Sequence, residues 1–340
     1  MMSFRIICIF ILWAITFSVS GQAKYRLVSY NVENLYDVTD EPGVNDNDFT
    51  PAGKNRWTHA RYTDKLLKIS RTLVAVGEGE LPAFIGLSEI ENRRVLEDLI
   101  SKSVLSEGDY EIIHRNSPDM RGIDVAFLYR TEFFTPLQQQ FIPISFPEDK
   151  RIRTRDILYT SGILATRDTL HFFVCHFPSM SGGELASEWK RERAASTLKH
   201  YIDSIQLWNK KANIIILGDL NGKADRTAQK VVLGVKSSDD RKIKNENLYN
   251  TGYYLLNKNE GSYKYQGDWQ TIDHIIVSGV LLDSKNRIYT DKRLKLFQED
   301  FLLEEDKKYF GFKPYRTYSG PRYHGGYSDH LPIYLDIYSK

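Results

Sequence analysis

Cysteine is nearly absent from this chain, with only Cys8 and Cys175 among 340 residues. Cys8 lies in an N-terminal apolar run that we expect to be removed, so Cys175 would remain without a partner for an intramolecular disulfide. An excess of one charge is also lacking, because 46 basic and 44 acidic side chains give a formal net charge of +2. A near-neutral chain has no general attraction for nucleic acid, so any basic surface must be local. A large apolar core must therefore hold the protein together.

The only long apolar run lies at the N-terminus. A short charged start at 1–5 precedes an apolar stretch at 6–19 and the small-residue segment Ser20-Gly21-Gln22-Ala23. This pattern is typical of a secretory signal peptide. The run is shorter than the ~20 apolar residues that a spanning helix needs, which disfavours the alternative of an uncleaved membrane anchor. We predict a signal peptide at 1–23, a single domain at 24–340, and a periplasmic or extracellular protein with no stable membrane insertion after cleavage.

Helical and strand patterns alternate along the rest of the chain, without a low-complexity linker or a clear domain boundary. Apolar residues at helical spacing predict helices at 59–76 and 184–207. β-Rich runs predict strands at 25–30, 83–87, 124–129, 140–144, 163–166, 170–175, 214–217, 272–277 and 333–337, with a hairpin around Arg167-Asp168. This order suits an α+β sandwich in which helices cover two packed sheets.

Polar side chains gather where the predicted strands end. Asn31, Glu89, His176 and Asp219 lie at or just past the C-terminal ends of their strands, whereas Asp273 and the pair Asp329-His330 lie at N-terminal ends. If these residues form one site, the two groups of strands must run in opposite directions. The sheets should therefore be antiparallel or mixed rather than all parallel.

The ordered motifs resemble the endonuclease/exonuclease/phosphatase superfamily, which includes DNase I-like nucleases and inositol-phosphate phosphatases. The motifs span nearly the whole chain: Ser29-Tyr30-Asn31-Val32-Glu33-Asn34, Leu87-Ser88-Glu89-Ile90-Glu91-Asn92, Cys175-His176-Phe177-Pro178-Ser179, Gly218-Asp219-Leu220-Asn221, Ile272-Asp273-His274-Ile275 and Ser328-Asp329-His330-Leu331-Pro332. The resemblance implies a four-layer αββα sandwich with two packed, mainly antiparallel or mixed sheets. It also implies a metal-dependent phosphoric ester hydrolase with its site at one edge of the sheets.

The resemblance assigns a metal site to Glu89, Asn31, Glu33 and Asp329. A hard divalent cation such as Mg²⁺ or Mn²⁺ prefers oxygen ligands and needs only one or two carboxylates. Glu33 departs from the aspartate often found at its position in that superfamily. For Glu89, the alternative is an exposed loop glutamate.

The resemblance also gives roles to the catalytic candidates Asp219, Asn221, His330, Asp273 and His176. Asp219 would orient or deprotonate the attacking water, and the Asn221 amide would donate to a phosphate oxygen. Asp273 would fix the tautomer of His330, which would donate to the phosphoryl oxygen. His176 would lie near the leaving group. The alternatives are an ordinary turn at residues 219–221 and a core histidine at position 176.

Two basic features could contact substrate, as could Asn31. Arg191 lies on the inward stripe of a predicted helix, where a phosphate contact and a structural salt bridge are equally good explanations. The basic run at 150–155 could hold a phosphate backbone, although such runs are usually solvated.

We therefore expect an exported nuclease that hydrolyses nucleic acid phosphodiester bonds by in-line water attack, with no obligate protein partner. The alternatives are a phosphatase or phosphodiesterase for a small phosphorylated or lipid substrate, and a non-catalytic binding protein with the same fold.

Overall fold

The structure is a computed structural model that describes residues 22–340. All but the last two residues of the predicted signal peptide lie outside the described residues, so export and cleavage stay predictions. Within residues 22–340, no helix has the length and apolar character needed to cross a lipid bilayer.

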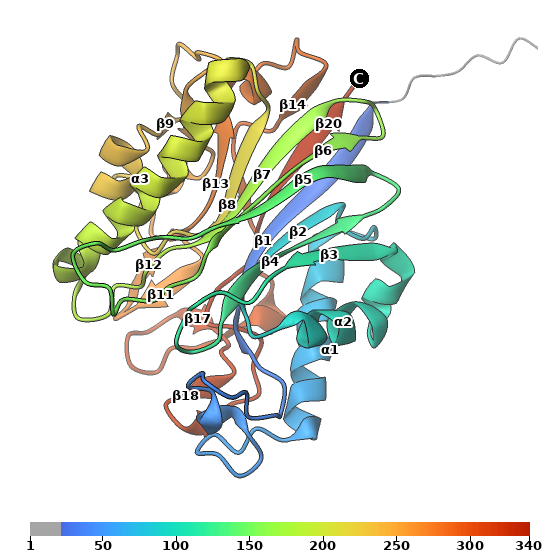
Figure 1. Cartoon of the computed structure of the whole chain (residues 1–340). Coiled ribbons are helices and arrows are strands. Elements are labelled where there is room, and N and C mark those ends of the chain that lie inside the picture. The colour runs from blue at the N-terminus through green and yellow to red at the C-terminus, as the bar shows by residue number, and fades with distance from the viewer. Residues whose placement is uncertain (1–21) are drawn as a thin grey trace, which may run out of the picture.

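Two large sheets form the centre of the fold (Figure 1). The first contains β1 (Ala23–Leu35), β2 (Phe84–Ile90), β3 (Tyr110–His114), β4 (Asp124–Arg130), β14 (Ile288–Thr290), β15 (Lys295–Leu296) and β20 (Ile333–Ser339). Its order is β14-β20-β1-β2-β4-β3, and β15 also pairs with β20.

The second sheet has the order β5-β6-β7-β8-β13-β10-β9. Its strands are β5 (Phe134–Ile142), β6 (Ile157–Leu164), β7 (Thr169–His176), β8 (Ile214–Asp219), β9 (Lys236–Ser237), β10 (Leu248–Asn250) and β13 (Asp273–Ser278). Both sheets are mixed: β1–β2, β7–β8 and β9–β10 are parallel, whereas the other neighbours are antiparallel. The expected antiparallel or mixed arrangement is confirmed.

Three two-stranded hairpins follow in the C-terminal third of the chain. They are β11 (Tyr263–Tyr265) with β12 (Asp268–Gln270), β16 (Leu303–Glu305) with β17 (Phe312–Pro314), and β18 (Tyr318–Ser319) with β19 (Arg322–Tyr323). Their strands are only two or three residues long. Such short elements give too few periodic positions to be recognised from sequence.

The helices α1 (His59–Val76) and α3 (Glu184–Trp208) occur where the apolar spacing predicts them. The Thr58 side chain caps α1 by accepting a hydrogen bond from the backbone N–H of Arg61. A third helix, α2 (Arg93–Ser101), is not among the predicted elements. It has only nine residues, but Asn92 caps it by accepting from the N–H of Val95.

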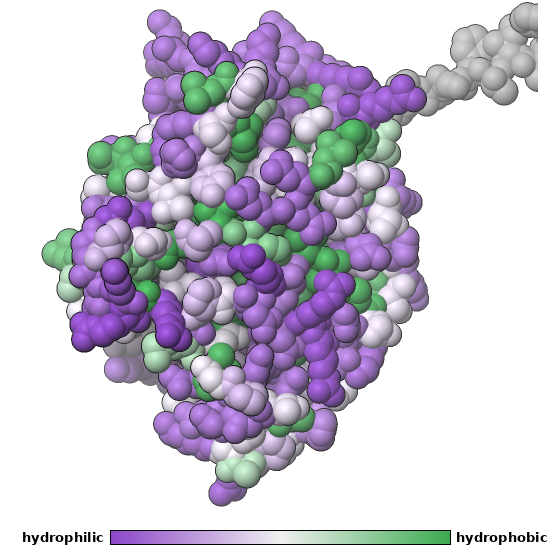
Figure 2. Space-filling view, in the orientation of Figure 1, coloured by the Kyte–Doolittle hydropathy of each residue, from purple (hydrophilic) through white to green (hydrophobic). Residues whose placement is uncertain are grey.

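Alternate residues of each central strand enter different core layers, as the two-residue period of a strand requires. Leu27 and Leu217 pack between the sheets, whereas Val28 packs towards α1 and Ile216 towards α3. The first sheet is thus covered by α1 and α2 and the second by α3 (Figure 1). These layers confirm the four-layer αββα sandwich. The face shown in Figure 2 is mostly hydrophilic, with hydrophobic residues in small separate groups.

Most predicted strands begin or end some residues away from their predicted bounds; β1, for example, continues to Leu35, and two strands start several residues earlier than predicted. β5 spans 134–142 rather than 140–144, and β6 spans 157–164 rather than 163–166. The predicted hairpin is present, because β6 and β7 pair antiparallel around a turn that contains Arg167 in a left-handed conformation. The sequence places β5 too late because the middle of this strand includes exposed polar residues such as Gln138.

One edge of the two sheets collects the polar strand ends. Asp219 and Asp273 are register partners at the ends of antiparallel β8 and β13, and His176 pairs beside Asp219 at the end of β7. On the other sheet, β1 and β2 lose regular pairing beyond Asn31, and Glu89 has a φ of 68°. Such an irregularity redirects a side chain at the end of a strand.

Candidate active site

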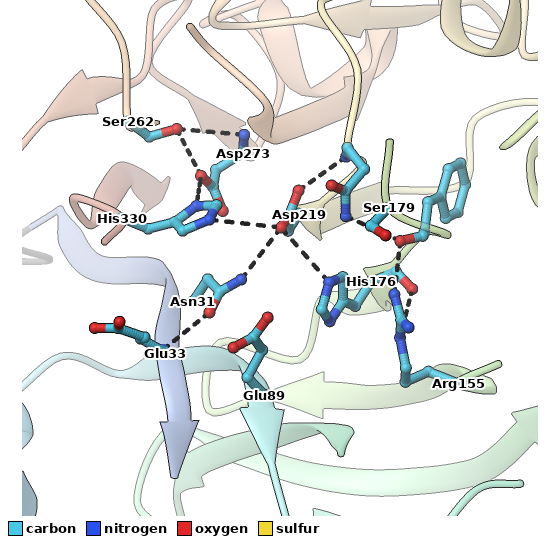
Figure 3. A network of polar contacts seen from close by, with 12 residues as sticks. Asn31, Glu33, Glu89, Arg155, His176, Ser179, Asp219, Ser262, Asp273 and His330 are labelled. Carbon is cyan, nitrogen blue, oxygen red and sulfur yellow. Dashed lines mark hydrogen bonds and ion pairs between the residues drawn. The ribbon is translucent and has the colours of Figure 1, made fainter. Parts of the chain in front are cut away.

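Asp219 lies at the centre of a cluster of polar side chains at this edge (Figure 3). Its Oδ2 accepts a hydrogen bond from Asn31 Nδ2 at 3.2 Å, and it lies 3.6 Å from His176 Nε2 and 3.9 Å from His330 Nε2. Its Oδ1 accepts from the backbone N–H of Asn221 at 2.8 Å. Three side-chain nitrogen atoms from different segments of the chain thus converge on one carboxylate oxygen.

Asp273 and His330 form the predicted pair. His330 Nδ1 lies 2.7 Å from Asp273 Oδ2, and the Ser262 hydroxyl donates to the same oxygen at 2.5 Å. Burial by itself favours neutral His330, but the carboxylates of Asp273 and Asp219 outweigh it and raise the pKa of His330. Burial, together with the charge on Asp273, also raises the pKa of Asp219. The site therefore combines a protonated imidazole with a carboxylate that accepts protons more readily than an exposed aspartate.

His176 is the neutral member of the cluster. Its burial, together with the positive charge of Arg155, lowers the pKa of His176 well below its usual range. Its Nε2 faces Asp219, whereas its buried Nδ1 has no hydrogen-bond partner within residues 22–340. A neutral imidazole can donate or accept a hydrogen bond at a substrate oxygen without adding a charge to the site.

Glu89 points its carboxylate towards the cluster from the end of β2 (Figure 3). One oxygen, Oε2, accepts from the backbone N–H of Asn34 at 2.9 Å. Asn31 joins the two halves of the site, because its Oδ1 accepts from the N–H of Glu33 at 3.0 Å while its Nδ2 donates to Asp219. These two hydrogen bonds fix which end of the Asn31 amide faces Asp219.

Arg316 lies between two of the predicted metal ligands. Its Nε is 3.2 Å from Glu33 Oε1, and its Nη2 is 2.9 Å from Asp329 Oδ2. The other oxygen of Glu33 accepts from the backbone N–H of Thr317 at 2.6 Å, and Lys65 Nζ lies 2.6 Å from the Thr317 hydroxyl. Both oxygens of Glu33 are thus engaged by the protein. The geometry does not support direct metal contact by Glu33. The Asp329 carboxylate is already paired with the Arg316 guanidinium.

The carboxylates of the cluster are ligands that suit a hard divalent cation. Asp219, Asp273 and His330 each present one possible ligand atom, and the three atoms lie within 4.8 Å of one another. Asp273 Oδ1 is buried and has no hydrogen-bond partner in the described part of the chain. Together with Glu89, these carboxylates supply the donors that Mg²⁺ or Mn²⁺ prefers.

Asn221 and Arg191, two further residues predicted to contact substrate, both form hydrogen bonds within the protein. Asn221 Nδ2 donates one of its two amide hydrogens to the carbonyl oxygen of Phe177 at 3.0 Å. The second amide hydrogen is not used in this contact. Arg191 is buried, and it donates to Glu188 Oε2 at 2.8 Å and to the Glu184 carbonyl oxygen at 2.6 Å. These contacts support the structural salt bridge for Arg191 and not a contact with substrate.

Within the basic run at 150–155, Arg155 has a structural role. It pairs with Asp119 at 2.9 Å, and it donates to the carbonyl oxygens of His176 and Phe177 at 3.2 Å and 2.7 Å. Arg155 therefore holds the strand end that carries His176. By contrast, Arg153 is exposed and lines a cleft next to the active site.

A cleft of about 610 Å³ opens over the cluster. Its lining includes residues that the sequence motifs do not single out, namely Arg121, the loop 180–184, Tyr263, Tyr265 and Gln270. The Tyr263 ring packs against His330 with centroids 4.9 Å apart. The β11–β12 hairpin leaves one signal in the sequence. The turn pair Gln266-Gly267 lies between two short stretches with aromatic residues, Tyr263–Tyr265 and Asp268–Gln270.

Comparisons with known proteins agree with this architecture. The sequence model of the Endonuclease/Exonuclease/phosphatase family matches residues 26–339. A search of curated proteins found no match.

Several solved structures are similar. A family protein from Bacteroides thetaiotaomicron has 15% identity and a TM-score of 0.56, with 94% of this chain and 96% of that chain covered. A mannosyl-6-phosphatase from the same species has 14% identity and a TM-score of 0.55, with 92% and 99% covered. A humanized D. rerio TDP2 has 16% identity and a TM-score of 0.53, with 92% and 98% covered.

Because the match spans nearly the whole described chain, this protein belongs to the endonuclease/exonuclease/phosphatase family. It is a divalent-metal-dependent phosphoester hydrolase, as the members of that family are. The solved structures share the fold of this protein, but their sequence identities are too low for their substrates to be assigned to it.

Proposed function

We propose that this protein is an exported, Mg²⁺-dependent nuclease that hydrolyses phosphodiester bonds in nucleic acid. The observation that supports a polymeric substrate is that two clefts with basic side chains adjoin the catalytic cleft at different parts of its lining. A polymer that passes through the site would meet cations beyond the bond to be cut.

The first adjoining cleft is lined by Arg121, Arg153 and Lys190, and it shares Arg121, Ser179 and Ser181 with the catalytic cleft. Arg121 and Arg153 are exposed, and Lys190 is partly exposed. Lys and Arg in such a position neutralise backbone phosphates and release their counterions.

The second adjoining cleft is lined by Lys308, Lys313 and Arg316, and it shares Tyr263 and Asp329 with the catalytic cleft. It therefore opens at a different part of the catalytic cleft from the first. The basic residues of the two clefts come from segments more than a hundred positions apart in the sequence, and of them only Arg153 belongs to the basic run at 150–155.

The side chains of the cluster suit in-line hydrolysis. Asp219 accepts the proton of an attacking water, because its carboxylate is buried and its pKa is raised. His330, held protonated by Asp273, donates to a phosphoryl oxygen as negative charge develops. Neutral His176 assists the leaving oxygen from its place beside Asp219. Glu89 and the neighbouring carboxylates would hold a divalent ion, which would supply Lewis-acid polarisation of the phosphoryl group.

A second candidate function is hydrolysis of a small phosphoester, the alternative that the sequence motifs also allow. The size of the catalytic cleft favours it, because about 610 Å³ is within the range of cavities that hold a small molecule. The mannosyl-6-phosphatase among the similar structures carries such an activity in its name.

An assay panel separates the two candidates. Purified protein lacking residues 1–23 is incubated with plasmid DNA, RNA, sugar phosphates and bis(p-nitrophenyl) phosphate, with Mg²⁺ and with a chelator. We expect Mg²⁺-dependent cleavage of a nucleic acid. Turnover of a sugar phosphate with no cleavage of either polymer would overturn the proposal.

A variant tests the first adjoining cleft directly. Arg153→Gln with Lys190→Gln should raise KM for a nucleic acid and flatten its dependence on salt by about one unit of slope for each phosphate that is no longer neutralised. The matched control is Lys210→Gln with Lys211→Gln, two exposed lysines that follow α3 at its other end. Turnover of bis(p-nitrophenyl) phosphate should not change in either variant.

Export has its own test. The full-length chain is expressed in a bacterial host, and the N-terminus of the protein recovered outside the cytoplasm is sequenced. A protein that begins at Lys24 is the expected result, whereas an intact Met1 on membrane-bound protein would support the anchor instead.

A further inference from the structure

Four exposed aromatic side chains lie on two neighbouring hairpins beside the active site. Tyr265 ends β11, and Tyr309, Phe310 and Phe312 lie at the tip of the β16–β17 hairpin. Their exposed fractions are 53%, 39%, 84% and 60% respectively. We call these four residues the aromatic platform. So much exposed aromatic surface on two adjoining tips indicates a binding surface rather than incidental exposure.

The aromatic platform is held by buried polar contacts. The Lys264 side chain forms a buried ion pair with Asp306 at 3.1 Å, and its Nζ also donates to the carbonyl oxygens of Phe310 and Phe312 at 3.1 Å and 3.0 Å. Asp306 accepts from the backbone N–H of Tyr309 at 3.1 Å. The tip is therefore fixed in position before anything binds to it, which lowers the entropic cost of binding.

Phe310 has an unfavourable backbone conformation for its size. Its φ is 62°, in the left-handed region that bulky side chains rarely occupy. The ring makes no compensating contribution to the core, because 84% of the residue is exposed. A strained and exposed aromatic residue is expected at a position where the ring contacts a ligand.

The aromatic platform continues the catalytic cleft. Tyr265 lines the catalytic cleft together with His330, and Tyr309 lines the second adjoining cleft together with Lys308. Gly267 lies against Tyr309, so the two hairpins are in contact. Figure 1 shows β11, β12 and β17 at the same end of the molecule.

We propose that the aromatic platform stacks the unpaired bases of a single-stranded polynucleotide whose backbone crosses the active site. This inference rests on the proposed nuclease function and names its substrate class. Exposed rings can stack on the faces of unpaired bases, whereas in a duplex those faces are covered by neighbouring base pairs. The clefts supply phosphate contacts next to the rings, and stacking next to cationic grooves is how single strands are held without sequence preference.

The local charge favours a strand over a lipid surface. Close to the rings, the basic residues Lys307, Lys308 and Lys313 are accompanied in the sequence by acidic Glu304 and Glu305. Lys313 is 3.5 Å from Glu304, so part of this positive charge is already paired. Such a surface has little net attraction for a layer of anionic headgroups, whereas a strand can stack its bases on the rings without net charge and place its phosphates at exposed Lys308 and in the first adjoining cleft.

The test compares kinetics on single-stranded and double-stranded oligonucleotides of the same length. The variant Phe310→Ala with Phe312→Ala, two rings of the platform that do not line the catalytic cleft, is compared with Leu207→Ala with Trp208→Ala, which removes two exposed apolar side chains at the far end of α3. We expect KM for the single strand to rise about tenfold for each ring removed, with kcat nearly unchanged. The duplex, bis(p-nitrophenyl) phosphate and the control variant should show no such change, and the rise in KM should persist at high salt.

Other outcomes would contradict either the role of the aromatic platform or the nuclease function on which it rests. An equal KM for single strands in wild type and variant, with nuclease activity present, would overturn the platform and leave the nuclease function standing. Absence of cleavage on every nucleic acid in wild type would overturn the proposed function itself. Variant-sensitive sedimentation with phosphatidylcholine–phosphatidylglycerol vesicles, or a dimer that the variant dissociates, would assign the rings to a membrane or to a second copy instead.

Discussion

Asp273→Asn is the sharpest test of the catalytic cluster, because it removes one charge and almost no volume. Asp273 Oδ2 lies 2.7 Å from His330 Nδ1, and both residues are buried, so solvent does not screen the interaction. A hydrogen bond to a charged group contributes about 1.5–3 kcal/mol. At about 1.4 kcal/mol per tenfold change in rate, kcat should fall about 10- to 150-fold. KM should change little, because neither residue belongs to the basic clefts.

The assay measures kcat on bis(p-nitrophenyl) phosphate at saturating Mg²⁺, with circular dichroism to confirm the fold. Ser262→Ala is the matched control: it removes an uncharged donor to the same Asp273 oxygen, leaves the pair with His330 in place and should lower kcat less than Asp273→Asn does. His330→Ala and the double variant complete the cycle. If the pair acts as a unit, the double variant loses less than the product of the two single losses. Fully multiplicative losses would refute the reasoning.

The structure supports three more expectations. Glu89→Gln should abolish Mg²⁺ binding in a calorimetric titration and lower activity at least a hundredfold without changing the melting temperature; wild-type activity at limiting Mg²⁺ would exclude Glu89 as a ligand. Arg316→Gln removes the cation between two carboxylates and should lower the unfolding free energy by on the order of 2 kcal/mol in urea, whereas exposed Arg153→Gln should not. Burial lowers the pKa of His171 to about 4, so the unfolded chain takes up this proton between about pH 6.5 and 4 while the folded chain does not. Unfolding free energy should therefore fall with acidification across that window, and less steeply in His171→Phe; equal slopes would contradict the assignment.

Much of the site can be predicted because its residues lie at the ends of recognisable strands. The sequence places Asp219 and Asp273 at opposite ends of two strands, and the antiparallel register of β8 and β13 brings them together as that placement requires. The family resemblance pairs His330 with Asp273, and the contact is present. Long buried strands are easy to recognise, since their apolar runs are continuous.

The environment of the charged side chains cannot be predicted in the same way. Arg191 and Arg155 are basic residues in suggestive positions, but their buried partners are carbonyl oxygens and carboxylates that only the packed chain supplies. Glu33 is expected at the metal, and instead it is engaged by Arg316 and Thr317 from a loop more than 280 positions away. A burial pattern indicates that a charge needs a partner, but it does not identify that partner.

By itself, the sequence determined the α+β class, the mixed sheets and the order of the catalytic motifs, because each depends on a local pattern of apolar periodicity or on residues that end a strand. The tertiary structure alone decided which carboxylates remain free, which arginines are structural and where basic and aromatic residues collect around the cleft. Those properties arise where segments distant in sequence meet at one edge of two sheets. Tyr265 and Phe310, 45 residues apart and on separate short hairpins, share one surface only after the sandwich has formed.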